Sequence, residues 1–272
     1  MSVEDLLVCT SFLDGRIVLL SLNRPKQLNA LNREMIQSLS NELNRLSEDS
    51  AVEILVIGSQ LNKAFCSGVD VHYLQSLSNE DAAEFFADLA GLLEIVIRFK
   101  CPTIAAVTGY VYGAGADLAL ACDFRIAGES AKFRFPGSQF GVVLGTRRLI
   151  HEVGPARSRL LTLTGRTLDS MGALDFEIAH QVVEDSECFS TALSLAEQII
   201  QIPANGLHTI KNLCRNFGDS SEYNSTISVR LAKESILAGD FKKSLQSYLD
   251  RGINKQTTNV NSSRIRYTRN NY

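Results

Sequence analysis

The sequence lacks the features that mark several classes of protein. Its 272 residues contain no uncharged apolar stretch of about 18 residues, so we expect no membrane-spanning helix. The N-terminal segment has no basic stretch followed by an apolar run, so we expect no secretory signal. The formal net charge is −3, and only a weak basic cluster stands near the end (Arg264, Arg266, Arg269), so nucleic acid is not the expected partner. These absences predict a soluble, cytoplasmic protein.

Metal-binding and disulfide patterns are missing as well. The six cysteines form no C-x-x-C pair, and the four histidines lie far apart, so the ligand clusters of a zinc site are absent. A chain of this length needs no disulfides to build a stable core. Most of the cysteines lie among apolar residues, as small core side chains do. We therefore expect no bound metal.

The chain does have a globular composition and strands that alternate with helices. Hydrophobic residues make up 45% and charged residues 21%. Apolar runs at 17–22 and 52–57 read as strands, and 79–99 has the periodicity of an amphipathic helix. Such alternation predicts an α/β fold with a mostly parallel sheet. We expect a core domain at 1–202, a helical region at 203–253 and a flexible polar tail at 254–272.

The most informative stretch runs from Thr103 to Asp123, T-I-A-A-V-T-G-Y-V-Y-G-A-G-A-D-L-A-L-A-C-D. An apolar run breaks at Gly109, small residues cluster at Gly113 to Ala116, and a helical pattern begins with Asp117 in its first turn. Free N–H groups and the positive end of the helix dipole gather at such a turn, which suits an anionic oxygen. The alternative is a glycine-rich turn that lets a buried helix pack closely.

A second segment, F-C-S-G-V-D at Phe65 to Asp70, repeats this pattern. Gly68 allows a tight turn, and Asp70 can cap the helix that follows. Two such turns on neighbouring strands would place two backbone N–H groups side by side. Two donors aimed at one carbonyl oxygen form an oxyanion hole. The periodicity alone leaves open whether the two turns meet in space.

Four motifs occur in order along nearly the whole chain. They are L-N-R-P-K-Q-L-N-A-L (Leu22 to Leu31), K-A-F-C-S-G-V-D-V (Lys63 to Val71), I-A-A-V-T-G-Y-V-Y-G-A-G-A-D-L-A-L-A-C-D (Ile104 to Asp123) and F-K-K-S-L-Q-S-Y-L-D-R (Phe241 to Arg251). Together they resemble the enoyl-CoA hydratase/isomerase family, also called the crotonase family. The resemblance implies a crotonase-like spiral of ββα units and a C-terminal helical region that forms trimers or dimers of trimers. It also implies an acyl-CoA thioester as substrate, with coenzyme A entering as part of that substrate and no separate cofactor.

The resemblance further implies roles for individual residues. The two oxyanion donors would be the N–H groups of Val69 and Ala114, where alanine replaces a common glycine and would be strained if the turn required a positive φ. The segment Val69 to His72, with Asp70 and Val71, would line the coenzyme A channel, and Lys26 and Lys63 would lie near its phosphates. Arg251 would reach the coenzyme A of a neighbouring subunit, and Gly137 would bind substrate at the position discussed next. For the basic residues among them, a solvated surface side chain is the alternative.

The sequence departs from the family pattern where hydratases of the family carry two glutamates. Asp117 stands at the first position, and Gly137, in F-R-F-P-G-S-Q-F-G, stands at the second. Aspartate places its carboxylate about 1.5 Å further back than glutamate, and a misplacement of about 1 Å can cost about a hundredfold in rate. Glycine offers no acid or base, although it could make room for a bulky acyl group. Polar residues that could substitute stand nearby, at Tyr112, Arg134, Ser138 and Gln139.

This departure argues against ordinary two-carboxylate hydration. Asp117 as a single acid/base could move a proton while the two N–H groups hold the enolate, which fits double-bond isomerisation or atypical hydratase, lyase or decarboxylase chemistry. The rival hypothesis is a non-catalytic acyl-CoA-binding or assembly subunit in which Asp117 merely stabilises its helix. An RNA-binding relative would need a lysine-rich helix face, which 32–49 does not provide. A serine hydrolase would need a Ser-His-Asp triad, and the two turns present no nucleophile.

Overall fold

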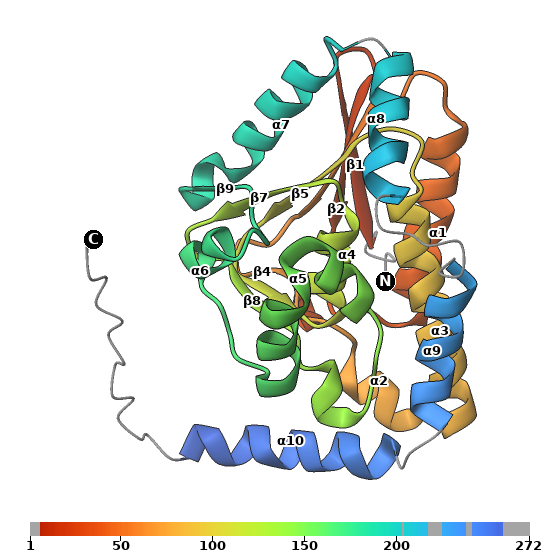
Figure 1. Ribbon diagram of the computed structural model, residues 1–272, viewed down its shortest axis with the longest axis vertical. Coiled ribbons are helices and arrows are strands. Elements are labelled where there is room, and N and C mark those ends of the chain that lie inside the picture. The colour runs from red at the N-terminus through yellow and green to blue at the C-terminus, as the bar shows by residue number, and fades with distance from the viewer. Residues whose placement is uncertain (1–5, 203, 217–224, 238–240, 258–272) are drawn as a thin grey trace.

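The computed structural model describes residues 6–202, 204–216, 225–237 and 241–257, and Figure 1 shows their arrangement. The strands are β1 (Leu7–Phe12), β2 (Ile17–Leu22), β3 (Ile54–Ser59), β4 (Ala64–Cys66), β5 (Thr103–Val107), β6 (Tyr110–Tyr112), β7 (Phe124–Gly128), β8 (Lys132–Arg134) and β9 (Gln181–Val183). The α-helices are α1 (Arg33–Glu48), α2 (Val71–Ser76), α3 (Asn79–Ile97), α4 (Ala114–Ala121), α5 (Thr146–Thr164), α6 (Ser170–Asp175), α7 (Cys188–Ile199), α8 (Ala204–Asn216), α9 (Ser225–Leu237) and α10 (Phe241–Thr257). Short 3-10 helices are η1 (Pro25–Gln27), η2 (Gly137–Phe140) and η3 (Asp185–Glu187).

Two sheets organise the fold. The larger has the strand order β1-β2-β3-β5-β7-β9, and every pair in it is parallel except the β1–β2 hairpin. The smaller, β4-β6-β8, is parallel. Along the chain, β3–β4, β5–β6 and β7–β8 each give one strand to the large sheet, one to the small sheet, and then continue into helices. The predicted α/β fold with a mostly parallel sheet, built from ββα units, is confirmed.

The large sheet is covered on both faces, because alternate residues of its strands point to opposite sides. On one face, Leu20, Leu55 and Val107 pack with apolar residues of α1, α3 and α4. On the other, Ile54 and Ile104 pack with apolar residues of α7. Figure 1 shows α7 on one side of the sheet and α1 and α3 on the other. A sheet buried on both faces explains why its strands read as nearly continuous apolar runs.

The C-terminal helices pack against the core of their own chain. Ala232 and Ile236 of α9 are buried with residues of α3, and the Lys233 Nζ lies 2.8 Å from an oxygen of Glu84. At the start of α10, the ring of Phe241 meets the ring of Phe86 edge to face, with centroids 6.1 Å apart. The Lys242 Nζ donates hydrogen bonds to two carbonyl oxygens at the end of α2. The sequence left open whether this region covers its own core or another subunit, and here it covers its own core.

The predicted division into a core domain, a helical region and a tail stays a prediction. Helix α10 continues to Thr257, four residues beyond the predicted end at residue 253. The rest of the predicted tail, 258–272, lies outside the described residues. Of the helices that the structure describes, none is long and apolar enough to cross a lipid bilayer.

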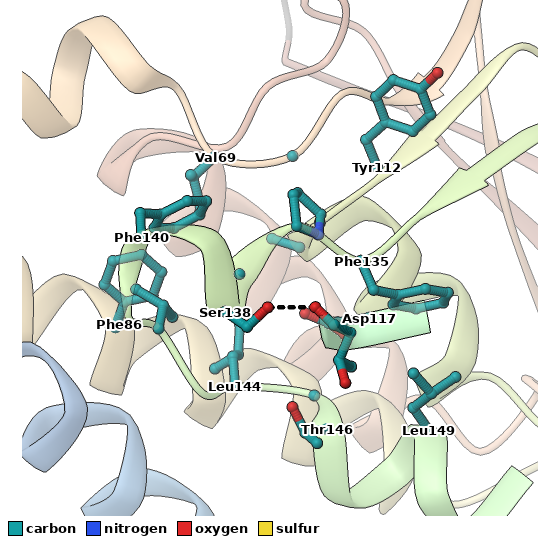
Figure 2. Close-up of a pocket in the computed structure, with 18 of the residues that line it drawn as sticks. Val69, Phe86, Tyr112, Asp117, Phe135, Ser138, Phe140, Leu144, Thr146 and Leu149 are labelled. Carbon is teal, nitrogen blue, oxygen red and sulfur yellow. Dashed lines mark hydrogen bonds between the residues drawn. The ribbon is translucent and has the colours of Figure 1, made fainter. Parts of the chain in front are cut away.

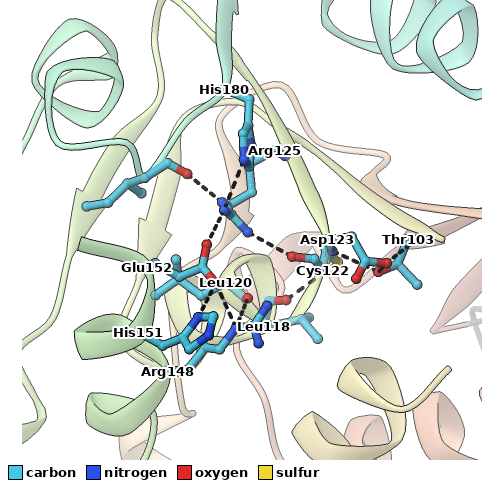
Figure 3. Close-up of polar contacts among 11 residues, drawn as sticks. Thr103, Leu118, Leu120, Cys122, Asp123, Arg125, Arg148, His151, Glu152 and His180 are labelled. Atoms are coloured by element: carbon cyan, nitrogen blue, oxygen red, sulfur yellow. Dashed lines mark hydrogen bonds and ion pairs between the residues drawn. The ribbon is translucent and has the colours of Figure 1, made fainter. Parts of the chain in front are cut away.

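A buried arginine of β7 connects the large sheet to α5 and to the end of α4 (Figure 3). Arg125 of β7 is fully buried, and its guanidinium donates to the carbonyl oxygens of Ile178 at 2.5 Å and Cys122 at 2.7 Å. It also pairs with Glu152 of α5 at 2.6 Å. The Nδ1 of His180 accepts from the Arg125 N–H at 3.0 Å, and burial lowers the pKa of His180 to about 4, so this imidazole is neutral at pH 7. The cluster fixes α5 relative to the end of α4.

Arg125→Met should lower the free energy of unfolding by about 3 kcal/mol, because it removes a buried cation and leaves buried acceptors without a donor. Arg16→Met is the matched control, since the Arg16–Glu53 pair has side chains that are 44% and 37% exposed. That change should cost less than about 1 kcal/mol. Urea unfolding of the two variants, at one protein concentration, measures the difference. Equal losses would contradict the structural role given to Arg125.

Candidate active site

Two strand-to-helix turns form the floor of the site. One leads from β4 through Gly68 and Val69 into α2, and the other leads from β6 through Gly113 into α4. Gly68 has a φ of +105° and Gly113 a φ of +51°, which L side chains rarely adopt. The positive φ falls on Gly113 and not on Ala114, so alanine at that position is unstrained.

The two turns lie against each other. A Cβ built on Gly68 would lie 3.9 Å from the amide nitrogen of Ala114, and one built on Gly113 would lie 4.0 Å from the Cα of Gly68. A Cβ on Gly115, in the first turn of α4, would lie 2.7 Å from the Cβ of Cys66, which is closer than side chains tolerate. The small residues therefore do what both sequence interpretations required. They let α4 pack closely, and they bring the Ala114 amide beside the Gly68 turn.

The N–H groups of Val69 and Ala114 remain unpaired at this contact. Within the described part of the chain neither group donates a hydrogen bond, whereas the N–H of Asp70 donates to Leu31 O at 2.8 Å and the N–H of Gly113 donates to Arg134 O at 2.8 Å. Val69 and Ala114 line one cavity. Backbone donors are rarely left without a partner, and a pair of them at a cavity wall can bind an oxygen of a ligand.

The segment before α1 holds the Val69 turn in place. The N–H of Leu31 donates to Gly68 O at 2.7 Å. Asn29 is buried, and its side chain donates to Phe65 O at 2.9 Å and to the Ser59 Oγ at 2.8 Å. Asn29 adopts a φ of +57°, which asparagine tolerates better than most residues. The motif L-N-R-P-K-Q-L-N-A-L thus supports the Val69 turn through Asn29 and Leu31.

A cavity of about 100 Å³ opens beside the two amides. Its apolar lining includes Phe86, Phe135, Phe140, Val142, Leu144 and Leu149, and its polar side chains are Ser67, Tyr112, Asp117, Ser138, Thr146 and Thr162. Figure 2 shows Phe86 and Phe140 on one side of Asp117, with Phe135 and Leu149 on the other. Among the described residues that line the cavity, Asp117 is the one carboxylate, and none is Lys, Arg or His. The cavity suits an apolar group and offers one strong acid/base.

Asp117 lies in the first turn of α4 and is half-buried. Burial raises its pKa from 3.8 to about 7, and a hydrogen bond from the N–H of Gly145 opposes this rise. No charged side chain contributes to the shift. A carboxyl group with a pKa near 7 can both accept and donate a proton at neutral pH.

Gly137 opens η2, after Pro136 and opposite Val142. A Cβ on Gly137 would lie 2.9 Å from the carbonyl oxygen of Val142, and the Val142 N–H donates to Gly137 O at 2.9 Å, which closes the loop on itself. A side chain at 137 would therefore meet the Val142 carbonyl, while Gly137 itself lines the cavity. That glycine makes room for a bulky acyl group stays a prediction. A glutamate at this position would require the loop to move.

The other predicted binding residues differ in whether they line the cavity. Val71 lines the cavity. Asp70 is buried, caps α2 by accepting from the Tyr73 N–H at 3.1 Å, and pairs with Arg24 at 2.8 Å, so its carboxylate is already used. The side chains that are exposed and stand apart from the cavity lining are Lys26, Lys63 and His72. Arg251 lies within α10.

Of the four polar residues suggested as substitutes for the second glutamate, two line the cavity and two do not. Tyr112 and Ser138 line the cavity. The other two side chains form a hydrogen bond with each other, from the Arg134 Nη2 to the Gln139 Oε1 at 3.3 Å. The Arg134 Nε also donates to the carbonyl oxygen of Gly165, at the C-terminal end of α5, at 2.8 Å. Within the part of the chain that the structure describes, no group of three or more His, Cys, Asp or Glu residues could hold a metal ion.

The sequence reasoning missed Gly145, whose amide contacts Asp117, and Arg24, which binds Asp70. Gly145 carries no side chain that could attract notice, and its backbone conformation is ordinary (φ −85°, ψ 5°). Arg24 does stand in the motif L-N-R-P-K-Q-L-N-A-L. Its position there was the one signal that could have singled it out.

The raised pKa of Asp117 predicts how stability depends on pH. The unfolded chain ionises this group near its usual pKa of 3.8, but the folded protein does so only near 7. Ionisation therefore costs stability, which is lost as the pH rises from about 4 to 7. Asp117→Asn removes the charge, so it should stabilise the protein by roughly 1–3 kcal/mol at pH 8 and by less at pH 5. Thermal unfolding at both pH values measures this. If the difference in stability between Asp117→Asn and the wild type is the same at both pH values, the pKa of Asp117 is not raised by folding and this prediction fails.

Comparisons with known proteins identify the family of this chain. The family model of enoyl-CoA hydratase/isomerase matches residues 14–257. A protein of Rhizobium meliloti described as a probable enoyl-CoA hydratase is 40% identical over 202 residues, which cover 73% of this chain and 76% of that protein. The crotonyl-CoA hydratase of Syntrophomonas wolfei is 33% identical over 190 residues, covering 69% of this chain and 73% of the relative.

Solved structures show the same fold. An enoyl-CoA hydratase/isomerase from Pseudoalteromonas atlantica superposes with a TM-score of 0.77 at 26% identity, over 91% of this chain and 98% of that one. An enoyl-CoA hydratase from Bacillus anthracis gives a TM-score of 0.74 at 25% identity, over 91% and 97%. The match of the family model to most of the chain, the relatives above 30% identity and the shared fold lead to one conclusion: the chain belongs to the enoyl-CoA hydratase/isomerase (crotonase) family.

Proposed function

We propose that this protein is an acyl-CoA enzyme that moves a proton next to the thioester carbonyl, with double-bond isomerisation as the reaction that the site fits best. In this proposal the N–H groups of Val69 and Ala114 bind the thioester oxygen, and Asp117 is the single acid/base. The observation that carries it is the position of one carboxylate, with a pKa near 7, on the wall of the cavity that the two unpaired amides also line.

The two amides would act on the charge that develops during the reaction. Removing a proton from the carbon beside a thioester leaves an enolate, whose negative charge collects on the former carbonyl oxygen. Donors that are already fixed at that oxygen need no reorganisation as the charge appears, and losing one such donor typically costs about a hundred- to thousandfold in kcat. The glycines that bring the turns together therefore supply catalytic donors without any functional side chain.

One carboxylate is sufficient for a shift of a double bond. Asp117 would remove a proton on one side of the enolate and return it to another carbon of the same system, so that it ends the cycle in its starting state. Adding water by the usual route of the family needs a second carboxylate, and Gly137 cannot supply one. Atypical hydratase, lyase or decarboxylase chemistry would use the same two amides and remains a possible outcome of the assay described below.

The coenzyme A part of the substrate would leave the cavity past α2 and η1. Ser67 lines the cavity, and its N–H donates to Leu28 O at 3.1 Å, which links the cavity wall to the residue that follows η1. This link supports Lys26, an exposed residue of η1, as a cation for a phosphate of coenzyme A. We retain Lys63, His72 and Arg251 as weaker proposals for the same role.

We also propose the trimer, or dimer of trimers, that the family resemblance implies. Exposed apolar side chains on α5 and α8 support an assembly, because a solvated surface seldom collects so many large apolar groups. They are Ile150, Leu160, Leu163, Ile210 and Leu213.

Asp117→Asn tests the proposed reaction. Wild-type protein is mixed in D₂O with a panel of saturated, 2-enoyl and 3-enoyl thioesters of coenzyme A, and mass spectrometry follows deuterium uptake, water addition and loss of CO₂. Asp117→Asn should reduce turnover by about 10²–10⁴-fold while the Kd for the acyl-CoA changes by less than about threefold. Asp88→Asn, the same change on an exposed face of α3, is the control and should keep full activity.

The outcomes separate the hypotheses. Isomerised product, identified by chromatographic separation of the 2-enoyl and 3-enoyl thioesters, supports the proposal with or without deuterium, because Asp117 can return the same proton before it exchanges with the solvent. A product heavier by one water favours atypical hydration. Tight binding without proton exchange by the wild-type protein would favour the non-catalytic subunit. If none of the thioesters binds, the acyl-CoA function fails altogether.

A further inference from the structure

A glycine of α5 stands directly against the carboxylate of Asp117. Gly145 precedes the first turn of α5, with φ −85° and ψ 5°, and its carbonyl oxygen accepts from the Leu149 N–H at 3.0 Å. Any L residue can adopt this conformation, so the backbone gives no reason for glycine. The reason must lie in what a side chain would meet.

A side chain at 145 would collide with Asp117. A Cβ built on Gly145 would overlap the Oδ1 of Asp117 and would lie 2.9 Å from the Asp117 Cβ. By contrast, a Cβ built on Gly91 in α3 would have no neighbour within 4 Å. The missing side chain at 145 is therefore what gives the aspartate its present position.

The same residue also contacts the carboxylate through its backbone. The N–H of Gly145 donates a hydrogen bond to Asp117, and it is the one interaction that opposes the effect of burial on the pKa of this group. The N–H belongs to the start of α5, where amides have no partner inside the helix. A carboxylate held there is favoured in its charged form.

Among the described residues that line the cavity, no other charged group competes for this role. The cavity wall carries Asp117 and the phenol of Tyr112 as its titratable side chains among the described lining residues. On α5, the Arg148 Nε donates to Leu120 O at 3.1 Å and pairs with Glu152 at 3.1 Å, so its guanidinium serves the neighbouring cluster of Figure 3. Glu152 is engaged by Arg125 and Arg148 and does not line the cavity.

We propose that Gly145 is the positioning residue of this site: its lack of a side chain makes room for the Asp117 carboxylate, and its N–H fixes that carboxylate by a direct hydrogen bond. The proposal rests on the proposed function for its catalytic consequence, but the contact itself does not depend on the reaction. Through this contact α5, and not α4 alone, determines where the acid/base stands. The contact also keeps the ionised carboxylate accessible near neutral pH.

The contact can be observed in the wild-type protein without substrate. The sequence contains a single Leu-Gly pair, Leu144-Gly145, so labelling with carbonyl-¹³C leucine and ¹⁵N glycine gives one signal selected by their shared peptide bond. The amide proton of Gly145 should shift with pH, with a midpoint near 7, as Asp117 ionises. The shift should vanish in Asp117→Asn. An amide signal that does not titrate, or that titrates equally in Asp117→Asn, would overturn the proposal.

Gly145→Ala tests the consequence for catalysis. The added Cβ should displace the carboxylate by on the order of 1 Å, which predicts a loss of about a hundredfold in kcat with little change in KM. The midpoint of the pH–rate profile should rise, because the displaced carboxylate loses its hydrogen bond. Gly91→Ala is the matched control and should leave kcat and the midpoint unchanged.

The two experiments also separate this proposal from the proposed function. If Gly145→Ala fails to fold, the amide titration of the wild-type protein still decides the contact. If the amide titrates but no thioester reacts, the contact stands and the proposed reaction fails. If Gly145→Ala has the kcat and the pH midpoint of Gly91→Ala, the positioning role is refuted.

Discussion

The site depends on one constraint, which is the close approach of two backbone turns that carry almost no side chains. Gly68 and Gly113 take conformations that other residues avoid, and Gly115 leaves the space that the Cys66 side chain fills. At this contact, Val69 and Ala114 line the same cavity. The surrounding structure keeps the two turns in contact. Leu31 and Asn29 bind the segment around Gly68, and the buried apolar residues of α4 fix the other turn in the core.

The constraint leaves two donors unpaired in a largely apolar cavity, which is costly for a folded protein unless a ligand uses them. The same apolar surroundings raise the pKa of Asp117 towards neutrality. The apolar lining of the cavity would therefore have two effects on the proposed reaction. It would strengthen a hydrogen bond to an enolate oxygen, and it enables a carboxyl group to exchange a proton near pH 7. Among the described residues that line the cavity, Asp117 is then the one carboxylate.

Much of the fold was predictable because local sequence patterns determine its strands and helices. Alternating apolar runs and helical periodicity predicted the parallel sheet, and small residues before a helical pattern predicted the turns at Gly68 and Gly113. Family resemblance, not periodicity, indicated which two amides to expect at the site. The docking of α9 and α10 was not predictable, since an amphipathic stripe requires a partner without identifying it. Arg125 stood inside an apolar strand, yet its partners Ile178 and Glu152 come from distant segments.

Gly145 shows the limit of sequence reasoning most clearly. It has no functional group and an ordinary φ, and its importance arises from an atom of Asp117 that only the tertiary structure brings beside it. The same holds for Gly137, whose neighbour Val142 O is a backbone atom that no side-chain pattern reveals. At both positions a side chain would collide with a neighbouring residue. Only the tertiary structure shows which neighbour that is.

The central claim is that the amides of Val69 and Ala114 hold a thioester oxygen between them. The most direct test is isotope-edited infrared difference spectroscopy of a saturated acyl-CoA with a ¹³C-labelled thioester carbonyl, bound to the wild-type protein. Two fixed donors draw electron density towards the oxygen and weaken the C=O bond, so the account predicts a stretching frequency below that of the same thioester in water. A frequency equal to the solution value, or raised as in an apolar environment without donors, would contradict it.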